Sequence, residues 1–110
     1  MKFILKRHKS KDKFSFTLVE GNKTILKSQM YASKRNAMTG INAVIKNAPL
    51  ERRYDIRQSK DGRWYFNLKA ANGKIVATST FFKTEEELED VKKMLKDEIE
   101  NATIEYIEEE

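Results

Sequence analysis

The chain repeats itself at a spacing of about fifty residues, and this repeat limits its possible folds more than any other feature of the sequence. The segment KFSFTLVEGNKTILKSQM at residues 13–30 corresponds to RWYFNLKAANGKIVATST at residues 63–80. At this spacing Phe16 aligns with Phe66, and aromatic and aliphatic positions match on both sides of this pair. Repeat arrays need several copies to form a solenoid, so two copies favour a pair of units that share one hydrophobic core.

Each copy combines an alternating pattern with a helical one. Alternating polar and apolar residues predict half-buried strands, and the pair Asn72-Gly73 predicts the turn of a hairpin. The period then changes to that of a helix, with Ser33 and Thr84 as the expected N-caps. Glu87 follows Thr84 at the spacing of a capping box. The expected strands lie at residues 3–8, 14–18, 24–29, 54–59, 64–70, 74–79 and 103–107.

These elements predict an α+β fold in a single domain over residues 1–110, with internal repeats at about 1–50 and 51–110. Each repeat has the order β-β-β-α, and a further strand follows each helix. One repeat is only slightly longer than the limit of about 40 residues below which chains rarely fold unaided, and we expect it to have too little apolar surface to fold alone. Together the repeats predict one antiparallel sheet with both helices packed on one face. Because this pseudo-dimer is already covalent, we expect a monomer.

Composition excludes several classes of function. The sequence has no cysteine and a single histidine, which rules out disulfides, thiol catalysis, iron–sulfur clusters and histidine-rich metal sites. The longest apolar runs have three or four residues, whereas a membrane-spanning helix needs about 20. The N-terminus lacks the order of a signal peptide, and no glycine-rich phosphate loop or calcium loop occurs. We therefore expect a cytoplasmic protein with no cofactor, no metal and no membrane association.

Charge is unevenly distributed along the chain. The net charge is +5, but residues 1–50 hold eleven lysines or arginines against two acids, and residues 84–110 hold three against twelve. A separation of this kind creates a directional field that can steer a polyanion toward one end of the molecule. The competing interpretation is that these charges only keep a polar surface solvated, and the sequence leaves both interpretations open.

Two strings resemble those of the YegP-like family of bacterial domains: SKRNAMTGINAVIKNAP at residues 33–49 and LKAANGKIVATS at residues 68–79. The first matches the family's helix pattern S-K-x-x-A-x-x-G-I, and the second matches its LKAANG hairpin. The resemblance implies a single sheet of two β(3)-α-β units with C-terminal strands exchanged between the repeats, and no established biochemical function. Neither copy carries both strings, which favours a structural role for these residues.

The solvent-exposed face of the predicted sheet is the best candidate binding surface. Lysine and arginine replace the counterions of a nucleic acid, and an exposed tyrosine such as Tyr65 can stack a base. RNA-recognition sheets carry two or three aromatic residues in defined motifs, which this sequence lacks. The candidate residues for binding a nucleic acid or an acidic protein are Lys6, His8, Lys9, Lys11, Lys13, Arg57, Arg63, Tyr65 and Lys69.

These observations predict a small non-enzymatic binding or interaction module. The alternative is low-specificity binding of single-stranded RNA or DNA through the basic face. An enzyme of unknown type ranks third, because the sequence places no nucleophile beside a base. His8 has only basic neighbours, so we assign it no catalytic role. A sheet edge could also accept a partner strand, although lysine-rich edges usually prevent this.

Overall fold

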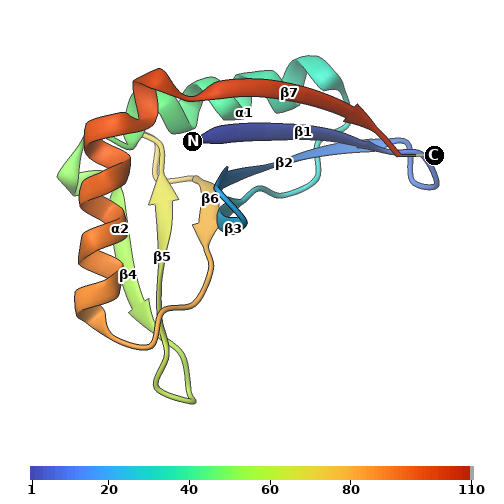
Figure 1. Ribbon diagram of the computed structural model, residues 1–110. Coiled ribbons are helices and arrows are strands. Elements are labelled where there is room, and N and C mark those ends of the chain that lie inside the picture. Colours follow the sequence, from blue (N-terminus) through green and yellow to red (C-terminus); the bar gives the residue numbers. More distant parts are fainter. Residues whose placement is uncertain (110) are drawn as a thin grey trace.

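The structure is a computed structural model that describes residues 1–109, folded into one seven-stranded sheet with two helices (Figure 1). The α+β class and the two helices are as predicted. The strands are β1 (Lys2–His8), β2 (Lys13–Glu20), β3 (Lys23–Lys27), β4 (Tyr54–Gln58), β5 (Trp64–Lys69), β6 (Ile75–Ser79) and β7 (Thr103–Glu108). The helices are α1 (Lys34–Asn47) and α2 (Glu85–Glu98), with short 3-10 turns η1 (Glu51–Arg53) and η2 (Ile99–Asn101).

The strand order in the sheet is β4-β5-β6-β3-β2-β1-β7. Neighbouring strands run antiparallel except at one edge, where β7 lies parallel to β1 with Ile104 beside Phe3. The sheet is therefore mixed, and the prediction of a purely antiparallel sheet is wrong. A tight hairpin forces its two strands to be antiparallel, whereas a strand that follows a helical crossover can take either direction. Alternating hydrophobicity carries no information about that direction.

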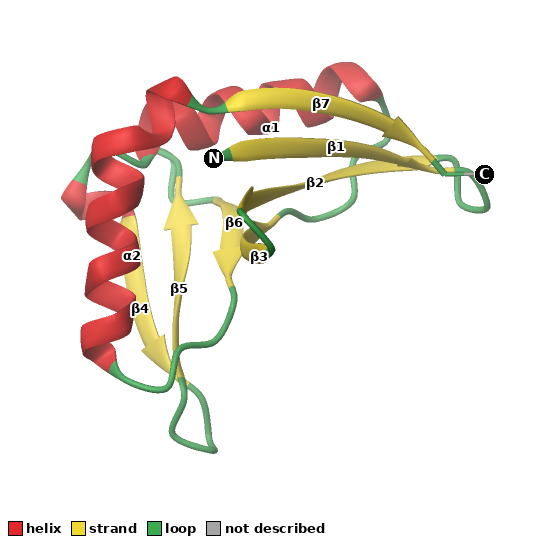
Figure 2. Cartoon of the chain, viewed as in Figure 1, coloured by secondary structure: helices red, strands yellow, loops and turns green. Residues whose placement is uncertain are grey.

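The two parts of the sheet meet along a short ladder. β3 and β6 pair only at Leu26 with Ser79 and at Lys27 with Thr78. Register irregularities interrupt the β2–β3 and β5–β6 ladders close to this contact, and such bulges bend and twist a strand. In Figure 2 the strands β4, β5 and β6 accordingly turn away from β1, β2 and β7. The sheet is strongly bent at its centre.

Both helices pack on the same face of this sheet. The ladders place Phe3, Phe16, Leu18, Phe66 and Leu68 on one side, and all five are buried in the same cluster as apolar residues of both helices. From the helices this cluster includes Ala37, Ile41, Val44, Leu88 and Leu95. The intervening strand residues face away from the helices, as the alternation predicted.

The predicted helix N-caps are confirmed. The Ser33 hydroxyl accepts a hydrogen bond from the Asn36 N–H at 3.0 Å, and the Thr84 hydroxyl accepts one from the Glu87 N–H at 3.1 Å. The Glu87 carboxylate accepts in return from the backbone N–H of Lys83 at 3.2 Å. Each cap satisfies a backbone donor that has no partner within the helix.

The loops after β3 and β6 are anchored by matching contacts. The Ser28 hydroxyl accepts from the Phe16 N–H at 2.8 Å, and the Ser79 hydroxyl accepts from the Phe66 N–H at 2.9 Å. Each hydroxyl donates to the carbonyl of the following residue. These bonds hold the start of each strand-to-helix loop against the neighbouring strand. No helix in residues 1–109 is long and apolar enough to cross a membrane.

Candidate functional site

The nine predicted binding residues lie in two separate groups at opposite corners of the sheet. The first group lies on β1, β2 and the hairpin between them: Lys6, His8, Lys9, Lys11 and Lys13. The second lies on β4, β5 and their hairpin: Arg57, Arg63, Tyr65 and Lys69. β3 and β6 lie between β2 and β5, and the two hairpins extend in different directions (Figure 1). The nine residues therefore do not form one continuous surface.

In the first group, the two residues on β1, Lys6 and His8, share an acidic partner. Glu109 Oε2 lies 3.6 Å from Lys6 Nζ and 3.6 Å from His8 Nδ1. Lys9 and Lys11 in the turn and Lys13 at the start of β2 are exposed and form no ion pair with any residue in the described part of the chain. Only the tip of this corner therefore carries uncompensated positive charge.

In the second group, every base is paired with an acid. Asp55 Oδ2 lies 2.9 Å from Arg57 Nε and 3.6 Å from Lys69 Nζ. The hydrogen bond from Arg57 lowers the pKa of Asp55. Arg63 pairs with Asp61 at 2.8 Å. The positive charge predicted for this corner is thus largely compensated within the molecule.

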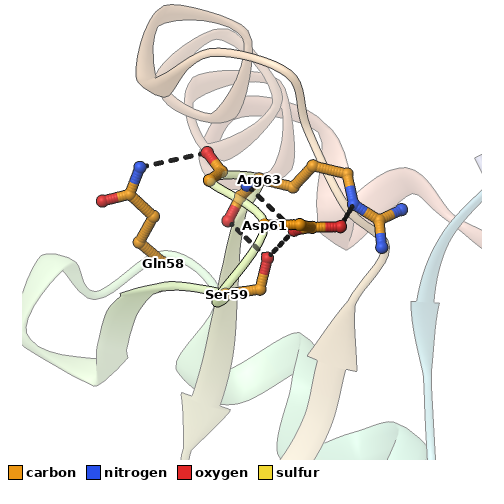
Figure 3. Close-up of polar contacts among 5 residues, drawn as sticks. Gln58, Ser59, Asp61 and Arg63 are labelled. Atoms are coloured by element: carbon orange, nitrogen blue, oxygen red, sulfur yellow. Dashed lines mark hydrogen bonds and ion pairs between the residues drawn. The ribbon is translucent and has the colours of Figure 1, made fainter.

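The hairpin between β4 and β5 fixes the position of Arg63 (Figure 3). The Ser59 hydroxyl donates to Asp61, and Asp61 also accepts from the Arg63 N–H at 3.3 Å and from Arg63 Nε at 2.8 Å. Gln58 Nε2 donates to the Gly62 carbonyl at 3.0 Å and closes the loop. These hydrogen bonds lower the pKa of Asp61, and the bond from Ser59 has the largest effect. The Arg63 guanidinium is therefore held in place before any ligand binds.

This guanidinium lies over Phe81, a residue that the sequence analysis did not select. The Arg63 Cζ atom is 4.1 Å from the centroid of the Phe81 ring, which is a cation–π contact. Tyr65 meets the same ring edge-on, with centroids 5.5 Å apart. Phe81 is nevertheless 49% exposed. The available signal was an aromatic residue in the loop just before a predicted helix N-cap, where no core position was expected.

Phe81 lies at a cavity of about 850 Å³ between β3, the loop after β6, and α2. We call it the Phe81 cavity. Its lining residues are Glu20, Lys23, Thr24, Ile25, Lys27, Thr80, Phe81, Phe82, Glu87, Asp90, Val91 and Met94. Ligand pockets in proteins typically have volumes of about 300–1,000 Å³ and are mainly apolar with a few polar groups. The Phe81 cavity has a volume in this range, and its lining combines five apolar residues with seven polar ones.

The two helices differ at a position that lines the cavity in α2. α1 carries Gly40 where α2, fifty-one residues later, carries Val91. A Cβ atom at Gly40 would lie 2.8 Å from Tyr31 Cζ, so Tyr31 packs directly against α1. Val91 instead lines the cavity next to Phe82. The smaller cavity on the other side of the β3–β6 ladder, about 350 Å³, touches no residue of α1.

His8 lies between a serine and an acid, an order that resembles a hydrolase triad. Its Nε2 atom is 2.7 Å from Ser15 Oγ, and Glu109 Oε2 is 3.6 Å from its Nδ1. The sequence concealed this because Ser15 comes from the neighbouring strand. These residues line neither of the two cavities described above. A nucleophile also needs a bound substrate and oxyanion donors beside it. Residues 1–109 also contain no group of three potential metal ligands.

The model of a family described as "Domain of unknown function (DUF1508)" matches residues 10–55 and 59–91. The UPF0339 protein YegP of Escherichia coli strain K12 is 45% identical over 76 residues, which covers 68% of this chain and 69% of that protein. The chain belongs to the YegP-like family. A UPF0339 protein of Shewanella oneidensis, another relative of this family, is 46% identical over 74 residues, or 66% of this chain and 67% of the relative.

Solved structures of the YegP-like family have the same fold. The solution NMR structure of YegP from Escherichia coli, described as a protein of unknown function, matches with a TM-score of 0.88 and 35% identity. The match covers 99% of this chain and 94% of the chain in that structure. The solution NMR structure of the Shewanella oneidensis UPF0339 protein matches with a TM-score of 0.86 and 36% identity, over 96% and 89% of the two chains. The resemblance found in the two sequence strings is thus confirmed, and the family's function is described as unknown.

Proposed function

We propose that this protein is a non-catalytic interaction module that binds an apolar group of its partner in the Phe81 cavity. The observation that carries this proposal is the position of Phe81, which lies half exposed at a cavity of about 850 Å³. Burying an aromatic ring releases water from its apolar surface and stabilises the buried state. A ring that remains half exposed beside an open cavity is therefore a suitable contact for the apolar group of a ligand.

The polar surroundings of the cavity support binding rather than catalysis. Arg63 and Tyr65 fix the Phe81 ring from two sides, and a fixed ring loses little conformational entropy when a ligand binds. Asp90 and Glu87 lie on the α2 wall. The Glu87 carboxylate already accepts a backbone hydrogen bond at the helix N-cap. The lining contains no histidine or cysteine, and its carboxylates, lysines and threonines can hold polar groups of a ligand.

We also infer that residues of about 1–50 and 51–110 form a tandem pair of repeats, with the strand after each helix exchanged to the other repeat. The matching bonds of Ser28 and Ser79 support this organisation. The position of β7 beside β1 supports the exchange. On this view the cavity lies between β3 of the first repeat and α2 of the second, so both repeats contribute to binding.

The proposal can be tested with a small apolar probe. N-acetylphenylalaninamide is titrated into the ¹⁵N-labelled protein, and we expect saturable NMR shifts at Ile25, Phe82, Val91 and Met94. Met94→Trp fills the cavity and should weaken binding about tenfold, equivalent to 1.4 kcal/mol. Met30→Trp changes an exposed methionine outside the cavity lining and is the matched control. Shifts that do not saturate, or equal binding by both variants, would refute the proposal.

A second candidate function is binding of a polyanion at the β1–β2 hairpin. It is favoured by Lys9, Lys11 and Lys13, which are exposed and form no ion pair with the described residues. Contacts between lysine and phosphate release counterions, so such binding must weaken as salt rises.

Fluorescence anisotropy with labelled single-stranded RNA, single-stranded DNA and duplex DNA, at about 50 and about 200 mM salt, tests this candidate. Replacing the three hairpin lysines by alanine should abolish binding and flatten its salt dependence. Lys69→Ala removes a lysine that already pairs with Asp55 and should have little effect. Absence of binding to all three nucleic acids at the lower salt would remove the candidate.

A further inference from the structure

Part of one edge of β3 lies along a wall of the Phe81 cavity and has no neighbouring strand. The last backbone bond that joins β3 to the chain leaving β6 runs from the Thr80 N–H to the Ile25 carbonyl at 3.1 Å. Phe82 then exchanges two backbone bonds with Trp64, at 2.8 and 2.7 Å, and this pairing draws the chain toward β5. In the described part of the chain, Lys23 and Thr24 therefore have no ladder partner on this side, and Ile25 has only the bond from Thr80.

We infer that an extended polypeptide segment of a partner protein binds here as a short added strand beside β3, with an apolar side chain in the Phe81 cavity. The inference rests on the proposed function and names the chemistry of its ligand. An added strand bonds to the free backbone groups of a sheet edge, and pockets beside that edge select alternate side chains. Free backbone groups and a pocket beside them are both present at β3.

The irregularity in β3 limits how long the added strand can be. The register of the β2–β3 ladder shifts between Leu18 and Val19, which leaves one extra residue in β3 beside the cavity. A bulge interrupts regular pairing, so only a few backbone bonds can form along Lys23–Ile25. The apolar residue in the cavity must then provide much of the affinity. A ligand that lacks either part should bind poorly.

Charges on the two walls indicate which side chains the segment carries. Lys23 and Lys27 lie on the β3 wall, and Asp90 lies on the α2 wall. None of the three forms an ion pair with a described residue. The other two acids of the lining already have partners. Glu20 lies 3.3 Å from the N-terminal amine of Met1, and Glu87 accepts from the Lys83 N–H. We therefore expect a segment with an apolar anchor, a basic side chain that reaches Asp90, and an acidic side chain toward β3.

The backbone part of the inference is tested with peptides. A phage library of random peptides of about ten residues, longer than an average strand, is selected against the intact protein. A selected peptide is then synthesised with single N-methyl groups along its backbone. Because successive N–H groups of a strand point in opposite directions, methylation of one alternating set should weaken binding about tenfold or more. Methylation of the other set should change it by less than roughly twofold.

The charge part is tested with exposed positions, where substitution leaves the core intact. Asp90→Lys should weaken the selected peptide about tenfold, and exchanging the peptide's basic residue for glutamate should restore binding to this variant. Asp97→Lys makes the same change on an exposed position of α2 outside the cavity lining and should have no effect. Equal losses in both variants, or no rescue, would contradict the predicted orientation.

The outcomes separate this inference from the proposed function. If the library yields no peptide, or if every N-methylated peptide binds equally well, strand addition at β3 is refuted. In that case saturable binding of N-acetylphenylalaninamide, lost in Met94→Trp, would still support the cavity as an apolar site. If neither the amide nor a peptide distinguishes Met94→Trp from the wild type, both the proposed function and the inference fail.

Discussion

Gly40 in α1 and Tyr31 in the preceding loop lie in direct contact. A Cβ atom built on Gly40 would stand 2.8 Å from Tyr31 Cζ and 2.9 Å from Cε2 of Phe16. The rings of Tyr31 and Phe16 stack with centroids 6.1 Å apart, and burial raises the pKa of the Tyr31 hydroxyl. The absence of a side chain at Gly40 thus allows α1 to close onto the sheet.

Gly40→Ala is expected to destabilise the fold, although alanine is the better helix former. The gain in helix propensity is about 1 kcal/mol, whereas forcing an extra methyl group into a packed contact costs about 1–3 kcal/mol. Urea denaturation should show a lower free energy of unfolding. Asn42→Ala, at an exposed position of the same helix, is the control and should be neutral or slightly stabilising. A more stable Gly40→Ala protein would contradict the close contact.

Ser79→Ala should destabilise the protein by about 1–3 kcal/mol, the cost of leaving a buried N–H without an acceptor. The Ser79 hydroxyl, in a residue only 8% exposed, accepts from the Phe66 N–H. Thermal or urea unfolding measures the change. Ser28→Ala removes the corresponding bond to Phe16 and should cost a similar amount, while exposed Ser10→Ala should cost nothing measurable. An unchanged stability for Ser79→Ala would mean that another acceptor replaces the hydroxyl.

Glu51 should contribute to the pH dependence of stability. Its carboxylate accepts hydrogen bonds from Lys92, at 2.5 Å, and from Lys96, and these bonds lower its pKa from the ordinary 4.5. A lowered folded-state pKa stabilises the protein above the ordinary pKa, and this contribution is lost as the pH falls through the folded-state value. Glu51→Gln should therefore lose roughly 1 kcal/mol at neutral pH, a small value because the side chain is largely exposed.

The same variant should show a weaker decline of stability below pH 4.5 than the wild type. Urea unfolding at a series of pH values compares the two curves. Glu98→Gln, at an exposed residue of α2 that forms no ion pair among the described residues, should leave the curve unchanged. Parallel curves for Glu51→Gln and the wild type would show that the bonds to the lysines do not persist in solution.

Phe81→Ala should separate binding from folding. Phe81 is 49% exposed, whereas Phe66 is fully buried. Truncation of a buried phenylalanine costs about 3–5 kcal/mol, so Phe66→Ala should be severely destabilised and Phe81→Ala should lose less than about 1 kcal/mol. Circular dichroism melting measures both. The folded Phe81→Ala protein should lose binding of the amide probe, and retained binding would exclude Phe81 from the site.

Much of the fold could be predicted because the repeat is visible in the patterns of neighbouring residues. The alternation around Phe16 and Phe66 is a property of neighbouring residues, and the N-caps Ser33 and Thr84 act within three residues of themselves. The direction of β7 could not be predicted, because it depends on where the chain emerges after α2. The candidate surface was predicted less well, since alternation shows which residues face outward but not which acids lie beside them.

The sequence by itself determined the α+β class, the helix starts and the outward-facing positions, because all of these follow from the spacing of nearby residues. Only the tertiary structure decided that Glu109 lies beside Lys6 and His8 and that Asp55 lies beside Lys69, since these charges meet through strand pairing. It also decided that β6 leaves β3 early and that a cavity remains beside Phe81. A gap between packed elements depends on how their side chains fill space together, and no local pattern records that.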